Sequence, residues 1–465
     1  MNSTARSLTL SKSTTKSLEI TLKVLAVIGM VLAIGKFFFP ATMEQFTHFT
    51  SAWSIGNIIR WFMFGGAIYI LMAAFYKNEK MANVAKLFLI PLTLISIIFL
   101  PDFINFNTSL TDPTNSALLL TVMILEIVVL IASSVLIIIL AGGGFREINF
   151  WKTLKTFLFV VLFTTPLNIL EFFKYIIPEN VLAGLAYHNF GFWHLIAIFV
   201  LIAVTLGLYF FLRKKDEEEK WQLLVILSLT FILTYVSKIS VSFISGYQGK
   251  TQWFNMLPLY VCDIGAILIP IAMLTKKKFF LDNLFFVNAV GAMSVFVFMG
   301  IDSLNGNNYI FSFNYLYFIL THALLFALSI MPVLLKLFKP KFKGILNGIA
   351  VFTVLYIVAT VVSAYISTIA FPTDNPDIWV YWMPNYCFTQ ICPLPLPFNF
   401  PSTTILGMSF NIPYLILLYI FYILMFLAFQ GLWKIGELIA KAVQNNRQRK
   451  LENKSMTIIM KALKK

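Results

Sequence analysis

The chain has 465 residues, of which 59% are hydrophobic and only 12% are charged, whereas soluble domains carry about 25% charged residues. Phenylalanine alone contributes 48 residues, and the mean hydropathy is +0.84. This composition excludes an ordinary soluble enzyme, a secreted disulfide-rich domain and a disordered chain. The long apolar runs also weigh against a membrane β-barrel. The sequence therefore predicts an all-α polytopic membrane helical bundle.

About 20 apolar residues are needed to cross the hydrocarbon core of a bilayer, and the chain contains about 12 such segments. Most of the 35 Lys and Arg residues fall in the two tails and in alternate loops. By the positive-inside rule, this distribution places both termini in the cytoplasm and the long loop between the last two spans outside. The predicted transmembrane helices are 18–40, 57–76, 84–105, 116–141, 153–177, 190–212, 220–246, 254–275, 280–301, 312–336, 344–370 and 411–434.

Ionisable side chains within membrane spans are costly, so each is a candidate functional residue. A rise of about 1.5 Å per residue places Cys262 about 12 Å and His322 about 15 Å below the outer ends of their predicted helices. Lys238 falls about 12 Å from the same face, and Glu126 and Glu171 also fall in the outer half. Interhelical contacts or buried ion pairs are an equally open explanation for Lys238 and the two glutamates.

A cysteine and a histidine at matched depth can form a nucleophile and base, because the imidazole can accept the thiol proton and leave a reactive thiolate. Taken alone, Cys262 has a structural alternative, since buried cysteines are usually inert. The neighbouring Asp263 points about 100° away on a helix, which makes it a supporting residue only.

The sequence contains no motif that indicates another kind of catalytic or binding site. There is no phosphate-binding loop, dinucleotide fingerprint or metal-spaced cluster of His and Cys, so we expect no metal, no cofactor and no nucleic-acid partner. Cys387 and Cys392 lie in the external loop between the last two spans. Both alternatives stay open for them, a disulfide across four intervening residues or two thiols.

The stretch 257–263 (LPLYVCD) resembles the LPLHLCD motif of YwaF-like bacterial integral membrane proteins. Tyr260 stands where that family commonly has His. The family is similar to the eukaryotic transmembrane protein 164 acyltransferase family, and more distantly to the androgen-induced threonine hydrolases. The resemblance covers about residues 188–434. Its weaker motifs are FGFWH at 190–194, DNLFF at 282–286 and LTHA at 320–323. In the last of these, Ala323 stands where the family commonly has Gly.

This resemblance implies that Cys262 is an acyl-accepting nucleophile and that His322 is the acid and base. Tyr260 and Asp263 would support the pair. Hydrogen-bond donors for the oxyanion are also required, and the sequence does not choose between Thr321, Asn314 and Lys238.

The resemblance further divides the chain into a five-helix N-terminal membrane module (1–187), a seven-helix catalytic bundle (188–434) and a basic cytoplasmic tail (435–465). The predicted function is cysteine acyl transfer on phospholipid or lysolipid chains through a thioester, with hydrolysis if water is the acceptor. The alternatives are a secondary transporter and a lipid-binding membrane protein, which would use the intramembrane Glu and Lys residues. The expected location is the cell membrane, and the oligomeric state is not indicated.

Overall fold

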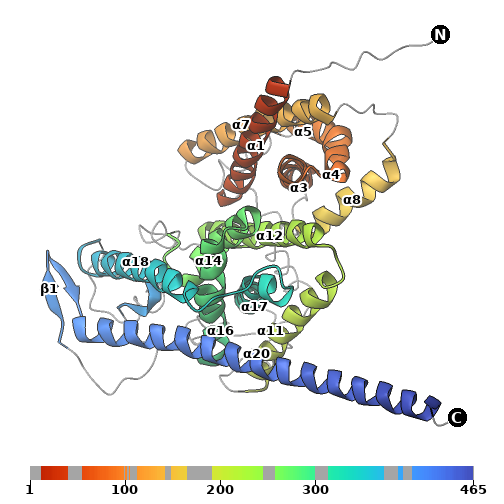
Figure 1. Cartoon of the computed structure of the whole chain (residues 1–465). Helices are drawn as coiled ribbons and strands as arrows, with labels where there is room; N and C mark the ends of the chain where they lie inside the picture. Colours follow the sequence, from red (N-terminus) through yellow and green to blue (C-terminus); the bar gives the residue numbers. More distant parts are fainter. Residues whose placement is uncertain are drawn as a thin grey trace.

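The computed structural model shows two groups of helices joined along helix α12 (Figure 1). Most of the apolar runs form helices, as expected for a chain whose backbone polar groups must be satisfied without water. The residues that the structure describes are 12–39, 55–98, 100–101, 104, 113–141, 148–164, 191–244, 257–298, 313–370, 386–390 and 401–463.

The first group contains the helices that precede residue 165. Helix α1 packs against α3 and α7, and α4 packs against α8. Polar side chains set two of the helix starts, because the Asn78 side chain accepts the Met81 N–H at α4 and the Asn149 side chain accepts the Lys152 N–H at α8. The elements are α1 (Lys12–Gly35), η1 (Lys36–Phe38), α3 (Ile55–Tyr76), α4 (Glu79–Val84), η3 (Ala85–Leu89), α5 (Ile90–Ile98), α7 (Pro113–Ala141) and α8 (Phe150–Phe163).

The second group surrounds α14 and α17, and α20 runs along its side (Figure 1). Helix α14 packs against α12 and α17, α11 packs against α17, and α18 packs against α15 and α20. The elements are α11 (Phe192–Leu212), α12 (Glu217–Ile244), α14 (Val261–Thr275), α15 (Lys278–Asn283), η6 (Leu284–Asn288), α16 (Ala289–Phe298), α17 (Phe313–Leu334), α18 (Gly344–Tyr365), η8 (Ile366–Ala370), η9 (Tyr386–Phe388), the hairpin β1 (Thr403–Ile405) and β2 (Met408–Phe410), and α20 (Ile412–Leu463).

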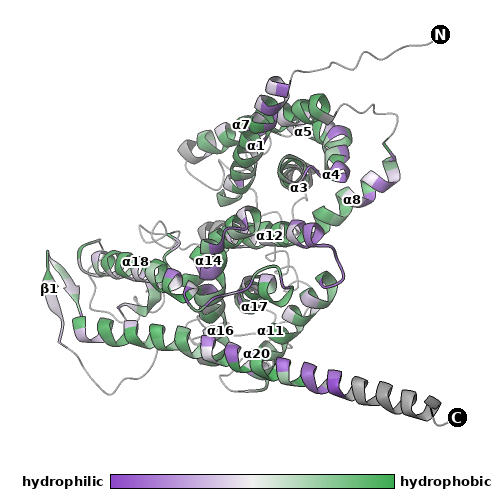
Figure 2. Ribbon diagram, viewed as in Figure 1, coloured by the Kyte–Doolittle hydropathy of each residue, from purple (hydrophilic) through white to green (hydrophobic). Residues whose placement is uncertain are grey.

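Most helices of both groups consist largely of hydrophobic residues, as Figure 2 shows. Large hydrophobic side chains on different helices point outward and are more than half exposed; they include Val31, Val128, Leu195, Val354 and Leu424. Apolar surface of this extent is unfavourable in water and is the normal exterior of a helix in lipid. In the described part of the chain, nine helical segments are long and apolar enough to cross a membrane. The protein is therefore a polytopic all-α membrane protein.

Each predicted span contains a helix of the structure, although three of these helices are shorter than predicted or only partly described. They are α8, α14 and the apolar end of α3 at Phe62–Tyr76. The total of twelve spans and the sides on which the termini lie remain predictions from the sequence.

The start of α14 corrects one expectation. The helix predicted from the sequence begins at residue 254, which would put Cys262 about two turns inside it, whereas the helix in the structure begins at Val261. Pro258 explains the difference, because proline disfavours a helical conformation for the residue before it and lacks the N–H that a helix interior needs. Cys262 therefore lies in the first turn of α14.

Helix α20 continues well beyond the predicted end of the last span. It forms one helix from Ile412 to Leu463, so the basic tail predicted from residue 435 extends the same helix. From Lys434 on, its described side chains are mostly exposed, and polar residues are interspersed with exposed apolar ones such as Ile435 and Leu438. Figure 2 shows hydrophilic residues along this part of α20. Lys434 and Glu437 form an ion pair there, with 2.6 Å between Nζ and Oε2.

A buried ion pair ties η1 to α7 within the first group. The ammonium of Lys36 donates to Oε1 of Glu126 at 2.6 Å, and the two side chains are 0% and 1% exposed. The ammonium also lies over the ring of Phe37 at 5.5 Å. Glu126 therefore has the ion-pair role that the sequence left open, whereas Glu171 lies outside the described residues.

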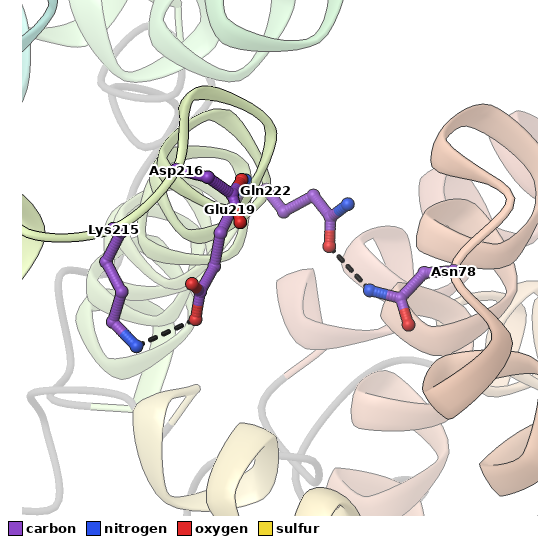
Figure 3. A network of polar contacts seen from close by, with 5 residues as sticks. All are labelled: Asn78, Lys215, Asp216, Glu219 and Gln222. Atoms are coloured by element: carbon purple, nitrogen blue, oxygen red, sulfur yellow. Dashed lines mark hydrogen bonds and ion pairs between the residues drawn. The ribbon is translucent and has the colours of Figure 1, made fainter.

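Polar contacts join the two groups at the start of α12 (Figure 3). Asn78, between α3 and α4, donates through Nδ2 to Oε1 of Gln222 in α12 at 2.5 Å. The connector before α12 caps this helix, because the Asp216 carboxylate accepts the Glu219 N–H at 2.8 Å. Lys276 strengthens the junction by placing its ammonium over the rings of Tyr76 and Trp221, at 5.2 and 5.4 Å.

Candidate active site at the first turn of helix α14

The thiol of Cys262 occupies the second position of α14, directly after Tyr260 and Val261. Its side chain is half-buried, and Sγ lies 3.7 Å from Oδ1 of Asp263. The first turn of a helix has backbone N–H groups that can donate to an anionic group. The first turn of α14 therefore places the thiol of Cys262 beside such donors and next to the Asp263 carboxylate.

The imidazole of His322 has a defined orientation on α17. Its Nδ1 donates to the carbonyl oxygen of Phe318 at 2.7 Å, and the ring packs against the Phe318 ring with 4.5 Å between centroids. A carbonyl oxygen can only accept, so Nδ1 carries the proton and Nε2 bears the lone pair of the neutral ring. A histidine held in this tautomer is suited to act as a base through Nε2.

Helices α14 and α17 approach each other closely one turn beyond these two residues. A Cβ atom on Gly265 would lie 2.8 Å from Cδ1 of Leu325 and 3.2 Å from the side-chain amide of Asn288, so a larger residue would require these side chains to shift. Residues three apart share one side of a helix. Cys262 precedes Gly265 by three residues and His322 precedes Leu325 by three, so each lies one turn before this contact on its own helix.

The other residues singled out from the sequence have different positions. Tyr260 ends the extended segment before α14, and Asp263 lies in the first turn, where the helix dipole favours an acidic side chain. The hydroxyl of Thr321 donates to the carbonyl oxygens of Tyr317 and Phe318 in its own helix. Lys238 belongs to α12 and Asn314 to α17, but their side chains lie outside what the structure describes.

Three tyrosines that were not among the site residues predicted from the sequence lie near Asp263. The hydroxyls of Tyr235 in α12, Tyr317 in α17 and Tyr386 in η9 all lie within electrostatic range of its carboxylate. The ring of Tyr386 packs edge-on against that of Tyr260, with 5.2 Å between centroids. Tyrosines are numerous in membrane helices and their spacing carries no signal of this kind, so only the fold could identify these three.

Cys387 is a second thiol at the same end of α14. It is buried, its Sγ donates to the carbonyl oxygen of Leu259 at 3.4 Å, and the Tyr422 hydroxyl donates to its own carbonyl oxygen at 3.2 Å. Cys387 and Phe388 both have positive φ, 49° and 59°, which non-glycine residues rarely adopt. The segment is thus held against α14 by specific contacts. Cys387 is a thiol and not half of a disulfide, while Cys392 lies outside the described residues.

Burial raises the pKa of the Cys387 thiol from 9.0 to about 12, with a smaller contribution from the Asp263 carboxylate. The folded protein therefore keeps this thiol protonated up to about pH 12, whereas the unfolded chain ionises it near pH 9. Its contribution to stability is complete below pH 9 and is lost as the pH rises toward 12. We predict that the thermal midpoint of the purified protein falls more steeply from pH 8 to 10.5 than that of Cys387→Ala.

The same burial predicts selective alkylation. In a Cys392→Ser background, which leaves two of the three cysteines, iodoacetamide at pH 7.5 should modify Cys262 and leave Cys387 unmodified until the protein unfolds. Mass spectrometry of the digested protein measures both sites. Equal labelling of the two thiols in the folded protein would contradict the described burial of Cys387.

Within the described residues, no three His, Cys, Asp or Glu side chains lie close enough to hold a metal ion. The second described histidine, His194, is buried in α11, and its Nε2 lies 3.0 Å from the carbonyl oxygen of Phe296 in α16. It therefore joins α11 to α16. In the described part of the second group of helices, the chemically distinctive residues lie in the first turn of α14 and on the side of α17 that faces it.

The part of the chain that resembles known proteins is the second group of helices. No curated protein and no solved structure matches the chain. Residues 189–429 match the TMEM164 family; this range covers more than half of the 465 residues and contains both α14 and α17. The expected relation to transmembrane protein 164 is thus confirmed, and the chain belongs to the TMEM164 family.

Proposed function

We propose that this protein is a membrane-embedded cysteine acyltransferase that acts on phospholipid or lysolipid acyl chains. The observation that carries the proposal is the meeting of α14 and α17 at Gly265 and Leu325, one turn from Cys262 and from His322. A thiol in the first turn of a helix and an imidazole with a defined tautomer supply a nucleophile and a base. Neither group needs a cofactor for acyl transfer.

In the first half-reaction, Nε2 of His322 accepts the thiol proton and Sγ of Cys262 attacks the ester carbonyl carbon of a lipid. The carbon–sulfur bond forms, the carbon–oxygen bond to the glycerol breaks, and His322 returns the proton to the departing alcohol. The products are a lysolipid and an acyl thioester on Cys262. In the second half-reaction, His322 deprotonates an acceptor hydroxyl or amine, which attacks the thioester and restores the thiol.

The family match begins at residue 189, and we assign the chemistry to the bundle of residues 188–434. Residues 1–187 are then an accessory module that reaches the catalytic bundle through contacts such as Asn78 with Gln222. The lateral approach of a lipid suits a site near one leaflet. We further propose a location in the cell membrane with both termini in the cytoplasm, from the distribution of Lys and Arg.

The test is covalent capture of the intermediate. Purified protein in phospholipid nanodiscs that contain a phosphatidylcholine with an alkyne-tagged acyl chain should acquire the tagged chain on Cys262 as a hydroxylamine-sensitive thioester. The Cys262→Ala variant should acquire none, whereas Cys387→Ala should be labelled like the wild type. Mass spectrometry of the digested protein locates the adduct.

An unlabelled wild-type protein, or a Cys262→Ala variant that still transfers acyl chains, would overturn the proposal. Binding of lipid without any covalent adduct would instead favour a lipid-binding protein. Movement of a solute across sealed vesicles that depends on Lys238 but not on Cys262 would favour a secondary transporter.

A further inference from the structure

Two buried hydroxyl groups near Asp263, the residue after Cys262, have no hydrogen-bond partner in the described part of the chain. They belong to Tyr235 in α12 and Tyr386 in η9, and Tyr386 is 0% exposed. A buried hydroxyl without a partner costs free energy, so folded proteins rarely keep one without a reason. Both groups can donate to an acceptor brought by a ligand.

Separate elements bring these two hydroxyls to the same end of α14. The Tyr386 ring packs against Tyr260, and the thiol of the next residue, Cys387, bonds to the carbonyl oxygen of Leu259. Tyr235 lies on α12, which packs along α14. The Tyr235 hydroxyl has Cys262, Asp263 and Tyr386 as electrostatic neighbours. Both donors therefore lie near Asp263, the residue that follows Cys262, although 151 positions separate them in the sequence.

The Tyr386 hydroxyl is suited to donate and not to ionise. Burial, with a smaller contribution from the Asp263 carboxylate, raises the pKa of Tyr386 above its ordinary value of 10.0, so its hydroxyl keeps its proton at neutral pH. The hydroxyl of Thr321, one of the donors suggested by the sequence, is already bonded to two carbonyl oxygens of α17. The tyrosine hydroxyls have no such competing acceptor among the described residues.

We propose that the hydroxyls of Tyr235 and Tyr386 bind the carbonyl oxygen of the lipid ester and stabilise the negative charge that develops on it when Cys262 attacks. The inference rests on the proposed function and adds the site for the reacting carbonyl. As the carbon–sulfur bond forms, the electron pair of the carbonyl π bond moves to this oxygen. The tyrosines keep their protons, and the electron pair returns when the bond to the glycerol oxygen breaks.

Two reactions at the same thiol distinguish this role from a structural one. Acylation by 4-nitrophenyl decanoate in detergent micelles passes through a tetrahedral oxyanion, whereas alkylation by iodoacetamide does not. Loss of one oxyanion donor typically lowers the rate by about 100- to 1,000-fold. We expect Tyr386→Phe and Tyr235→Phe each to lower the rate of acylation of Cys262 to this extent and to leave its rate of alkylation unchanged.

Stability provides a second readout with a matched control. Tyr386→Phe removes an unpaired hydroxyl and keeps the ring on Tyr260, so its thermal midpoint should equal or exceed that of the wild type. Tyr69, also 0% exposed, donates its hydroxyl to the carbonyl oxygen of Phe157 in the first group of helices. Tyr69→Phe should lower the thermal midpoint and leave both reactions at Cys262 unchanged.

The possible results separate this inference from the proposed function. Wild-type acylation rates in both tyrosine variants refute the carbonyl site and leave the Cys262 nucleophile intact. Acylation and alkylation that fall in the same proportion also refute it, since they indicate a displaced thiol. If wild-type Cys262 forms no acyl adduct with either the ester or the tagged phospholipid, the proposed function fails and the carbonyl site fails with it.

Discussion

His322→Ala is expected to lower the rate of acyl transfer to Cys262 by about 100- to 10,000-fold, the usual range for loss of a general acid or base. The reason lies in the geometry of α17, where the bond from Nδ1 to Phe318 leaves Nε2 as the basic nitrogen of the neutral ring. Without this nitrogen, the thiol proton has no positioned acceptor and the departing alcohol has no donor. Labelling of Cys262 by the tagged phospholipid, followed over time, measures the effect.

A double-mutant comparison tests whether the two residues act as a unit. Cys262→Ser should also lose most activity, because a hydroxyl ionises far less readily than a thiol. The double variant should be little worse than either single one, since groups that act together have strongly non-additive effects. Free imidazole should restore part of the activity to His322→Ala and none to Cys262→Ser.

His194 offers the matched control for a buried histidine. Its ring joins α11 to α16 through the Phe296 carbonyl and takes no part in the proposed chemistry. His194→Ala should lower the thermal midpoint while the activity of the folded fraction stays near the wild-type value. Full activity in His322→Ala, or equal losses in His194→Ala and His322→Ala, would exclude His322 as the base.

Breaking the ion pair of Lys36 and Glu126 is expected to destabilise the protein by about 3–5 kcal/mol, because either single substitution leaves an uncompensated charge in a dry interior. The pair is 2.6 Å long and almost fully buried. Lys36→Met should therefore lower the free energy of unfolding strongly, and so should Glu126→Leu. The double variant should recover most of the loss, since apolar residues often replace a buried ion pair at little cost.

Equilibrium unfolding in mixed micelles measures these differences. An exposed pair in the same group provides the control, because Lys77 and Glu19 also form an ion pair, at 3.0 Å, with side chains that are 74% and 39% exposed. Lys77→Met should change stability little, since water and salt screen exposed pairs. A double variant as unstable as Lys36→Met alone would show that the pair does not account for the loss.

The same variants bear on the transporter alternative. If Glu126 served as a coupling group, the stable double variant would lose function together with the charge pair. The acyltransferase proposal predicts instead that the double variant, once folded, acylates Cys262 at the wild-type rate. Stability and activity therefore respond independently in the two groups of helices.

The sequence by itself determined the polytopic helical architecture and the family. Apolar length is a local property of the chain, and each predicted span contains a helix because a backbone in lipid must satisfy its own polar groups. The residue types for a nucleophile and a base were also visible at Cys262 and His322, supported by the LPLYVCD stretch. Even the late start of α14 had a local signal in Pro258.

Only the tertiary structure decided which distant groups meet. Lys36 and Glu126 are 90 residues apart, and the sequence left the partner of Glu126 open. Tyr235 and Tyr386 became candidates only when α12 and η9 packed on the first turn of α14. Helices that are far apart in the sequence can pack against each other in the membrane. Their apolar faces have similar residue compositions, so the sequence does not indicate which helices pack together.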